Sequence, residues 1–218
     1  MVDLMAQQVI LIEEPSLSDQ LVQITPGTVD FALMVSGGLS VKNGTTLFDY
    51  LDLMVNALKP GGLLFVQVTP QSLASIGVYL DAKLNFKYWI VLESEIIHRP
   101  KGLPTVHAGL LLFVKGAEFK VEKIRVPHEY CSACNKTRKD WGGKAHLMNP
   151  EGYAISDVWK DSAPENNYTR LSQKFYKRIL QMVDYKGRDT IGVIAPAHSV
   201  LPEQFSPSFH EPVGDYQL

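Results

Sequence analysis

Two apolar stretches decide the fold: VDFALMV at residues 29–35 and LLFVQV at residues 63–68. Continuous apolar runs of this length are typical of strands that are buried on both faces of a sheet. Residues 45–58 lie between them, and Lys-Pro-Gly-Gly at residues 59–62 is expected to end a helix there. One face of that helix would carry Leu47, Leu51, Met54, Val55 and Leu58. A strand, a helix and a second strand in this order predict an α/β fold with a parallel sheet.

The apolar pattern predicts further elements on both sides of this unit. Strands are expected at residues 9–12, 86–93, 108–114 and 190–194, and helices at residues 16–27, at 71–83 and from 169 onward. The strands at 86–93 and 108–114 are joined by so short a segment that they must run antiparallel. We therefore predict a mostly parallel sheet that is finished by an antiparallel hairpin at its edge.

Composition limits the classes of protein that the chain can belong to. With 218 residues, of which 45% are hydrophobic and 20% charged, the chain can bury one substantial core, so we expect one domain with an insertion. The net charge of −2 gives no general attraction to nucleic acid, which must then be bound by a local patch. No apolar run approaches the length of about 20 residues that spans a bilayer, and we find no secretory signal. These features favour a cytoplasmic protein.

A cysteine pair marks the start of an unusual loop-like stretch, CSACNKTRKDWGGKAHLMNPEGYAISDVW, at residues 131–159. Cys131 and Cys134 have the spacing of a zinc knuckle, in which two thiolates converge on one ion. His128 and His146 are near enough in sequence to complete a tetrahedral site. The alternative is a reduced cysteine pair under the loop, with both histidines hydrogen-bonded to the backbone. Zinc is therefore one of two open predictions here.

The same stretch holds the densest basic cluster of a mildly acidic chain. Its members are Lys136, Arg138, Lys139 and Lys144, with Trp141 among them. Cationic side chains around an aromatic ring suit phosphate contacts and base stacking, so the cluster predicts nucleic-acid binding, with DNA favoured over RNA. Such a cluster can also be a solvated surface. Trp159, at the end of the stretch, is expected to anchor it to the sheet.

Several stretches resemble the DNA amino-methyltransferases, the S-adenosylmethionine-dependent enzymes that act on the N6 of adenine or the N4 of cytosine. The resemblance begins with VDFALMV, ALKPGGLLFVQV, YWIVLESE and HAGLLLFVKG, which are similar to the catalytic half of the family. KDWGGKAHLMNPEGYAISDVWKD resembles an insertion of some members, and TRLSQKFYKRILQMV and RDTIGVIAPAHSV resemble the cofactor-binding part. This order of motifs is the permuted one. The resemblance implies a truncated Rossmann-like class I methyltransferase fold with a small insertion around the CxxC motif.

The catalytic loop departs from the family pattern. The family has Asp, Asn or Ser followed by Pro-Pro and an aromatic ring, which together hold the target amine and stack on the flipped base. This chain has Ser36, Gly37, Gly38 and Leu39 at that place. The serine is kept, but the rigid prolines that orient the amine and the stacking ring are absent.

The cofactor-binding positions also depart from the family. The resemblance places Ala195, Pro196 and His198 where the family has Asp-Pro-Phe and a glycine turn, and Glu14 where an acidic residue follows the first strand. The glycines that let bare backbone approach the cofactor are absent. We also expect that the residues after Val200 are too few for the strands and helices that hold the cofactor's adenosine.

These departures predict a degenerate methyltransferase-like protein that is a nucleic-acid-binding or scaffold subunit of a homo- or hetero-oligomer. The alternative is an active S-adenosylmethionine-dependent methyltransferase with diverged motifs, completed by another subunit; a purely structural assembly subunit is a third possibility. The expected parts are a methyltransferase-like half (1–120), the CxxC and DWGGK insertion (121–165), a helix and strand that complete the sheet (166–200) and an extended tail (201–218).

Overall fold

The computed structural model describes residues 9–12, 24–39, 46–97, 101–138, 142–160, 167–187 and 189–196. Their helices are α2 (Leu47–Ala57), α3 (Leu73–Asp81) and α4 (Gln173–Met182), with a 3-10 turn, η2, at Ala145–Leu147. Their strands are β1 (Val9–Ile12), β2 (Val29–Val35), β3 (Leu58–Val68), β4 (Asn85–Ile97), β5 (Thr105–Val114), β6 (Arg125–Val126), β7 (Tyr153–Ala154), β8 (Val158–Trp159) and β9 (Ile191–Ile194). The predicted tail and most of the predicted helix at 16–27 lie outside these ranges.

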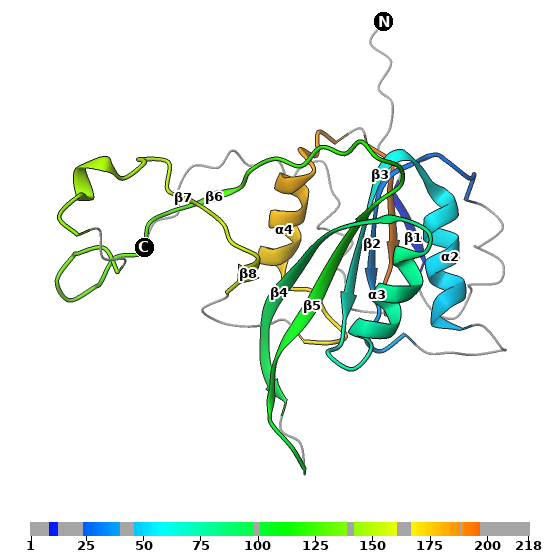
Figure 1. The fold of residues 1–218 in the computed structure, drawn as a ribbon, viewed down its shortest axis with the longest axis horizontal. Helices are drawn as coiled ribbons and strands as arrows, with labels where there is room; N and C mark the ends of the chain where they lie inside the picture. Colours follow the sequence, from blue (N-terminus) through cyan, green and yellow to red (C-terminus); the bar gives the residue numbers. More distant parts are fainter. Residues whose placement is uncertain are drawn as a thin grey trace, which may run out of the picture.

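One mixed sheet organises the described residues in the order β1-β9-β2-β3-β5-β4-β8 (Figure 1). β1, β9, β2 and β3 are parallel, β5 is antiparallel to both β3 and β4, and β8 runs parallel to β4. The predicted parallel sheet with an antiparallel hairpin is therefore confirmed. The hairpin is not the outermost element, however, because the two residues of β8 pair with β4 beyond it.

Helices cover both faces of the sheet, which explains the continuous apolar strands. In β2, Phe31, Leu33 and Val35 belong to the core that α4 covers, whereas Ala32 and Met34 belong to the core under α2 and α3. Figure 1 shows α4 on one side of the strands and α2 with α3 on the other. Both sets are buried, so neither face of β2 meets water and no alternation with polar residues is needed.

The predicted helix at residues 45–58 forms as α2 and ends at Ala57, before Lys-Pro-Gly-Gly as expected, but the next strand begins earlier than the predicted residue 63. Residues 59–62 do not form a loop, because β3 begins at Leu58 and runs through them. Gly61 has a φ of 80° and donates its N–H to the carbonyl oxygen of Lys115 at 2.7 Å. A glycine in this conformation keeps the strand paired without a Cβ in a strained position.

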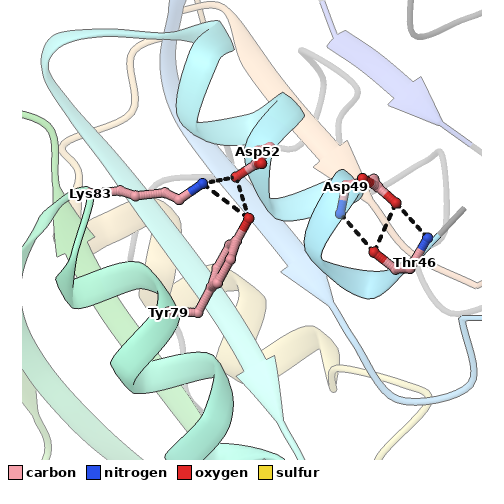
Figure 2. A network of polar contacts seen from close by, with 5 residues as sticks. All are labelled: Thr46, Asp49, Asp52, Tyr79 and Lys83. Carbon is pink, nitrogen blue, oxygen red and sulfur yellow. Dashed lines mark hydrogen bonds and ion pairs between the residues drawn. The ribbon is translucent and has the colours of Figure 1, made fainter.

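Two polar networks fix α2 (Figure 2). At its start, Thr46 and Asp49 form a capping box: Thr46 N–H donates to Asp49 Oδ2 at 2.6 Å, and Asp49 N–H donates to Thr46 Oγ1 at 3.3 Å. One turn further along, Asp52 accepts from the Tyr79 hydroxyl at 2.8 Å and pairs with the Lys83 ammonium, which ties α2 to α3 and the turn after it. Within the described residues, no helix is long and apolar enough to cross a membrane.

Candidate functional site: the carboxyl edge of the sheet and the basic insertion

The loops after β2 and β9 meet at one edge of the sheet. These two strands pair in parallel, with Phe31 opposite Ile191 and Met34 opposite Ile194. Their carboxyl ends therefore bring the loops that begin at Ser36 and Ala195 close together, at the place where open α/β sheets bind ligands. The structure thus brings together the described parts of the two sequence-predicted loops; Glu14 and His198 lie outside the described residues.

Ser36 is turned toward β3. Its hydroxyl donates to the carbonyl oxygen of Gln67 at 2.7 Å, and its N–H donates to the same oxygen at 3.0 Å. The side chain is half-buried. Its proton is thus committed to the backbone of the neighbouring strand.

The two glycines after Ser36 are pressed against a turn at residues 167–170. A Cβ placed on Gly37 would lie 1.8 Å from the Tyr168 carbonyl oxygen, which is far inside van der Waals contact. A Cβ on Gly38, whose φ is 80°, would lie 2.7 Å from Thr169 Cγ2 and 3.5 Å from Pro196 Cγ. Only glycine fits this closely, so the backbone of the turn lies directly against Gly37 and Gly38.

Gln67 holds the covering turn in place, and sequence reasoning missed this role. Its side chain is fully buried, and its Nε2 donates to the carbonyl oxygens of Asn167 at 2.5 Å and Arg170 at 3.1 Å. The available signal was a glutamine inside the otherwise apolar stretch LLFVQV, because a buried amide has to find hydrogen-bond partners.

The residues described at this edge pack on the core or on one another. Ala195 is 2% exposed and packs in the core beside α4, so its side chain is directed away from a ligand. Pro196 and Thr169 both lie close to Gly38, because a Cβ placed on that glycine would reach each of them, and Leu39 packs on the other core. The loops after β2 and β9 are therefore in contact with each other and with the turn at residues 167–170.

The predicted zinc ligands are not assembled. Within the described part of the chain, which includes His128, Cys131, Cys134 and His146, no three His, Cys, Asp or Glu side chains are grouped so that they could hold a metal ion. His128 Nε2 lies 2.9 Å from the Asn149 carbonyl oxygen, and His146 is exposed. A zinc site built from these four residues of one chain is thus not supported.

The two cysteines form a tight turn of their own. Cys131 N–H donates to the Lys136 carbonyl at 2.8 Å, and Asn135 N–H donates to the Cys131 carbonyl at 2.8 Å. The backbone N–H groups of Cys134 and Ala133 and the Cys134 thiol donate to the Cys131 sulfur, and they lower the pKa of Cys131 from its ordinary value of 9.0. Both cysteines are free thiols, and Cys134 is exposed.

The basic cluster lies on the surface as far as it is described. Lys136, Arg138 and Lys144 are exposed, whereas Lys139 and Trp141 lie outside the described residues. Arg138 Nη1 stands 3.7 Å from Glu129 Oε2, a loose pair that leaves the guanidinium in water.

Trp159 anchors the insertion to the sheet, as predicted. It is 1% exposed, lies opposite Leu92 across the β4–β8 pair, and has its ring centroid 6.1 Å from that of Phe175 in α4. The Arg178 guanidinium carbon lies 5.7 Å from the Trp159 ring centroid. Burial of this large ring joins the insertion to the α4 side of the core.

Sequence comparison agrees with this fold. Residues 45–191 match the model of the N6/N4 methyltransferase family, described as DNA methylase. The chain belongs to this DNA methylase family. It is also 33% identical over 144 residues to the type II methyltransferase M.BamHI of Bacillus amyloliquefaciens, an alignment that covers 63% of this chain and 33% of that protein. The chain therefore spans about a third of the length of the curated relative that it matches.

Solved structures share the fold at low sequence identity. The cytosine-N4-specific PvuII DNA methyltransferase matches with a TM-score of 0.53 and 10% identity, over 92% of this chain and 84% of that one. TTHA0409 of Thermus thermophilus, described as a DNA modification methylase, matches with a TM-score of 0.50 and 13% identity, over 92% and 95% of the two chains. These likenesses confirm the class I methyltransferase fold.

Proposed function

We propose that this chain is a non-catalytic member of the DNA methylase family that binds DNA through its basic insertion and acts as a scaffold or subunit. One observation supports the non-catalytic part: the turn at residues 167–170 lies directly against Gly37 and Gly38, which follow the serine kept from the catalytic motif. Methyl transfer to a base would require an open place for the flipped base at this loop.

The proposed DNA binding rests on positively charged side chains that are exposed to solvent. Lys136, Arg138 and Lys144 project from the insertion of a chain whose net charge is −2, so they supply a local attraction for phosphate that the whole molecule lacks. The insertion is joined to the sheet by the buried ring of Trp159.

The salt dependence of DNA binding tests this proposal. Each phosphate contact that is lost lowers the slope of log K against log salt by about 0.9 for a duplex. Neutralising Lys136, Arg138 and Lys139 to Gln together is expected to flatten the slope and weaken binding on every sequence. A matched control neutralises Lys174, Lys177 and Lys186, which are exposed on and after α4, and is expected to keep the slope. Equal slopes for both triple variants would contradict the proposal.

A second candidate is an active S-adenosylmethionine-dependent N6-adenine or N4-cytosine methyltransferase completed by another subunit. The observation that favours it is the 33% identity with M.BamHI, a protein named as a type II methyltransferase. In that case the contact between Gly37 and Tyr168 would have to open on assembly. Transfer of a labelled methyl group to DNA by the chain, alone or with a partner subunit, supports this candidate, and Ser36→Ala should then abolish the transfer.

A further inference from the structure

The insertion presents an aromatic ring on a hydrogen-bonded turn at residues 130–137. Tyr130 is 49% exposed, the highest exposed fraction of the Phe, Tyr and Trp residues that the structure describes. Its backbone forms an antiparallel β-bridge with Thr137, and the next residue, Cys131, donates its N–H to the Lys136 carbonyl oxygen at 2.8 Å. The turn thus supports a large ring that is in contact with solvent.

Two cations lie across the turn from this ring. Lys136 and Arg138 flank Thr137, the bridge partner of Tyr130, and both are exposed. Glu129 is the one acid of residues 129–138; its carboxylate stands 3.7 Å from Arg138 Nη1, and both side chains of this pair stay largely in solvent. An aromatic ring beside Lys and Arg is the combination with which proteins bind single-stranded nucleic acid, because bases stack on the ring while the cations contact phosphates.

A second exposed tyrosine lies in the same part of the insertion. Tyr153 in β7 is 37% exposed, and its ring centroid is 5.8 Å from that of His128. The His128 ring is held in turn by Asn149, whose carbonyl oxygen lies 2.9 Å from Nε2. His128 precedes Tyr130 by two residues, so their Cα atoms are at most about 7 Å apart. The region around the turn therefore offers more than one ring to a ligand.

The turn is also accessible to a long ligand. Ser132, Ala133, Cys134 and Asn135, which lie between the ring and the cations in sequence, are all exposed. In Figure 1 the green to yellow-green chain between β6 and β7 extends away from the sheet, on the side of β8 and α4. A nucleic-acid strand can therefore reach the turn without meeting the sheet.

The exposed ring decides between the two forms of DNA. In a duplex each base is stacked between its neighbours, so a protein side chain meets phosphates, sugars and base edges in the grooves. In a single strand the bases can unstack and offer their faces to a ring. We propose that the insertion binds unpaired DNA, with a base stacked on Tyr130 and the flanking phosphates contacted by Lys136 and Arg138. This inference rests on the proposed DNA binding and specifies the form of DNA that is bound.

Fluorescence anisotropy of the full chain with a labelled oligonucleotide, either single-stranded or annealed to its complement, tests the inference. The single strand is expected to bind more tightly than the duplex of the same sequence at the same salt concentration. Equal or tighter binding of the duplex would overturn the inference and leave the proposed DNA binding in place. Absence of binding to both oligonucleotides would overturn the two together.

Variants of the ring separate stacking from charge. Tyr130→Leu is expected to weaken binding of the single strand about 5- to 100-fold, the range that follows from loss of one stacked base. The slope of log K against log salt should stay unchanged, because no phosphate contact is lost. Tyr130→Phe keeps the ring and should bind like the parent chain. The matched control is Tyr88→Leu in β4, where the tyrosine is 44% exposed outside the insertion, and it should also bind like the parent.

Three results with these variants would overturn the inference. They are an unchanged affinity of Tyr130→Leu, an equal loss in Tyr88→Leu, and a flattened salt slope in Tyr130→Leu. Because both tyrosines are exposed, every variant should keep the circular dichroism spectrum of the parent chain, which shows that a loss of affinity does not come from unfolding.

Discussion

The carboxyl edge of the sheet and the insertion differ in how exposed their polar and reactive side chains are. At the edge, Ser36 hydrogen-bonds to β3 and the next two residues are glycines in contact with Tyr168 and Thr169. In the insertion, Lys136, Arg138 and Cys134 are exposed around a turn. In the first region the backbone of a turn lies against the loop, whereas in the second the polar groups are open to solvent. Of these two regions, the insertion is the one that the proposed DNA binding uses.

The largest expected effect on stability comes from Trp159, which joins the insertion to the sheet. Trp159→Ala removes a ring that is 1% exposed and packs on Phe175, so it should destabilise the fold by about 3–5 kcal/mol. The matched control is Trp89→Ala in the adjacent strand β4, where the ring is 46% exposed and the loss should be much smaller. Urea unfolding measures both. Equal losses would mean that the insertion is not anchored through Trp159.

A smaller effect is expected from filling the closed edge. Gly37→Ala would place a Cβ 1.8 Å from the Tyr168 carbonyl oxygen, so the turn must move, and overpacking of this kind typically costs about 1–3 kcal/mol. Gly77→Ala is the control, because nothing lies within 4 Å of its added Cβ inside α3. That variant should gain about 0.5–1 kcal/mol, since alanine is the better helix former. If Gly37→Ala is as stable as the parent chain, the edge is open.

The smallest effect concerns the support of the edge through α2. Hydrogen bonds from the Thr46 backbone and then its hydroxyl hold the pKa of Asp49 below its ordinary value of 3.8. A depressed pKa contributes stability above the unfolded value that is lost as the pH falls through the folded value. Asp49→Asn should therefore be less stable than the parent at neutral pH, and the difference should close below pH 3.8. Urea midpoints across this range measure it; a constant difference would exclude the carboxylate as its origin.

The sequence predicted the sheet because its signals are local. VDFALMV and LLFVQV are long apolar runs, and their burial on both faces follows from helices that can be read from the chain between and after them. β8 has two residues, too few for any periodicity, and only its pairing with β4 reveals it. Lys-Pro-Gly-Gly correctly predicted the end of α2, but the early start of β3 at Leu58 was missed, because the register between β2 and β3 shifts across residues 59–62 and no local pattern reveals such a shift.

The sequence identified candidate site residues, but it did not predict the long-range contacts that arrange them. The Ser-Gly-Gly loop was identified by its position after a strand, yet its closure depends on Gln67 reaching Asn167 and Arg170, about a hundred residues away. In the same way, CxxC spacing predicts two thiols that converge, whereas any further ligands of a metal site would depend on the tertiary fold. The histidines chosen by sequence distance do not join them in the described structure.

Calorimetric titration of the chain with S-adenosylmethionine tests the central claim, a closed carboxyl edge, most directly. Because the loops after β2 and β9 contact each other and the turn at residues 167–170, we expect no saturable heat of binding. Gly37→Ala should behave in the same way. Saturable binding accompanied by methyl transfer to DNA would contradict the account, since it would require the edge to be open in solution.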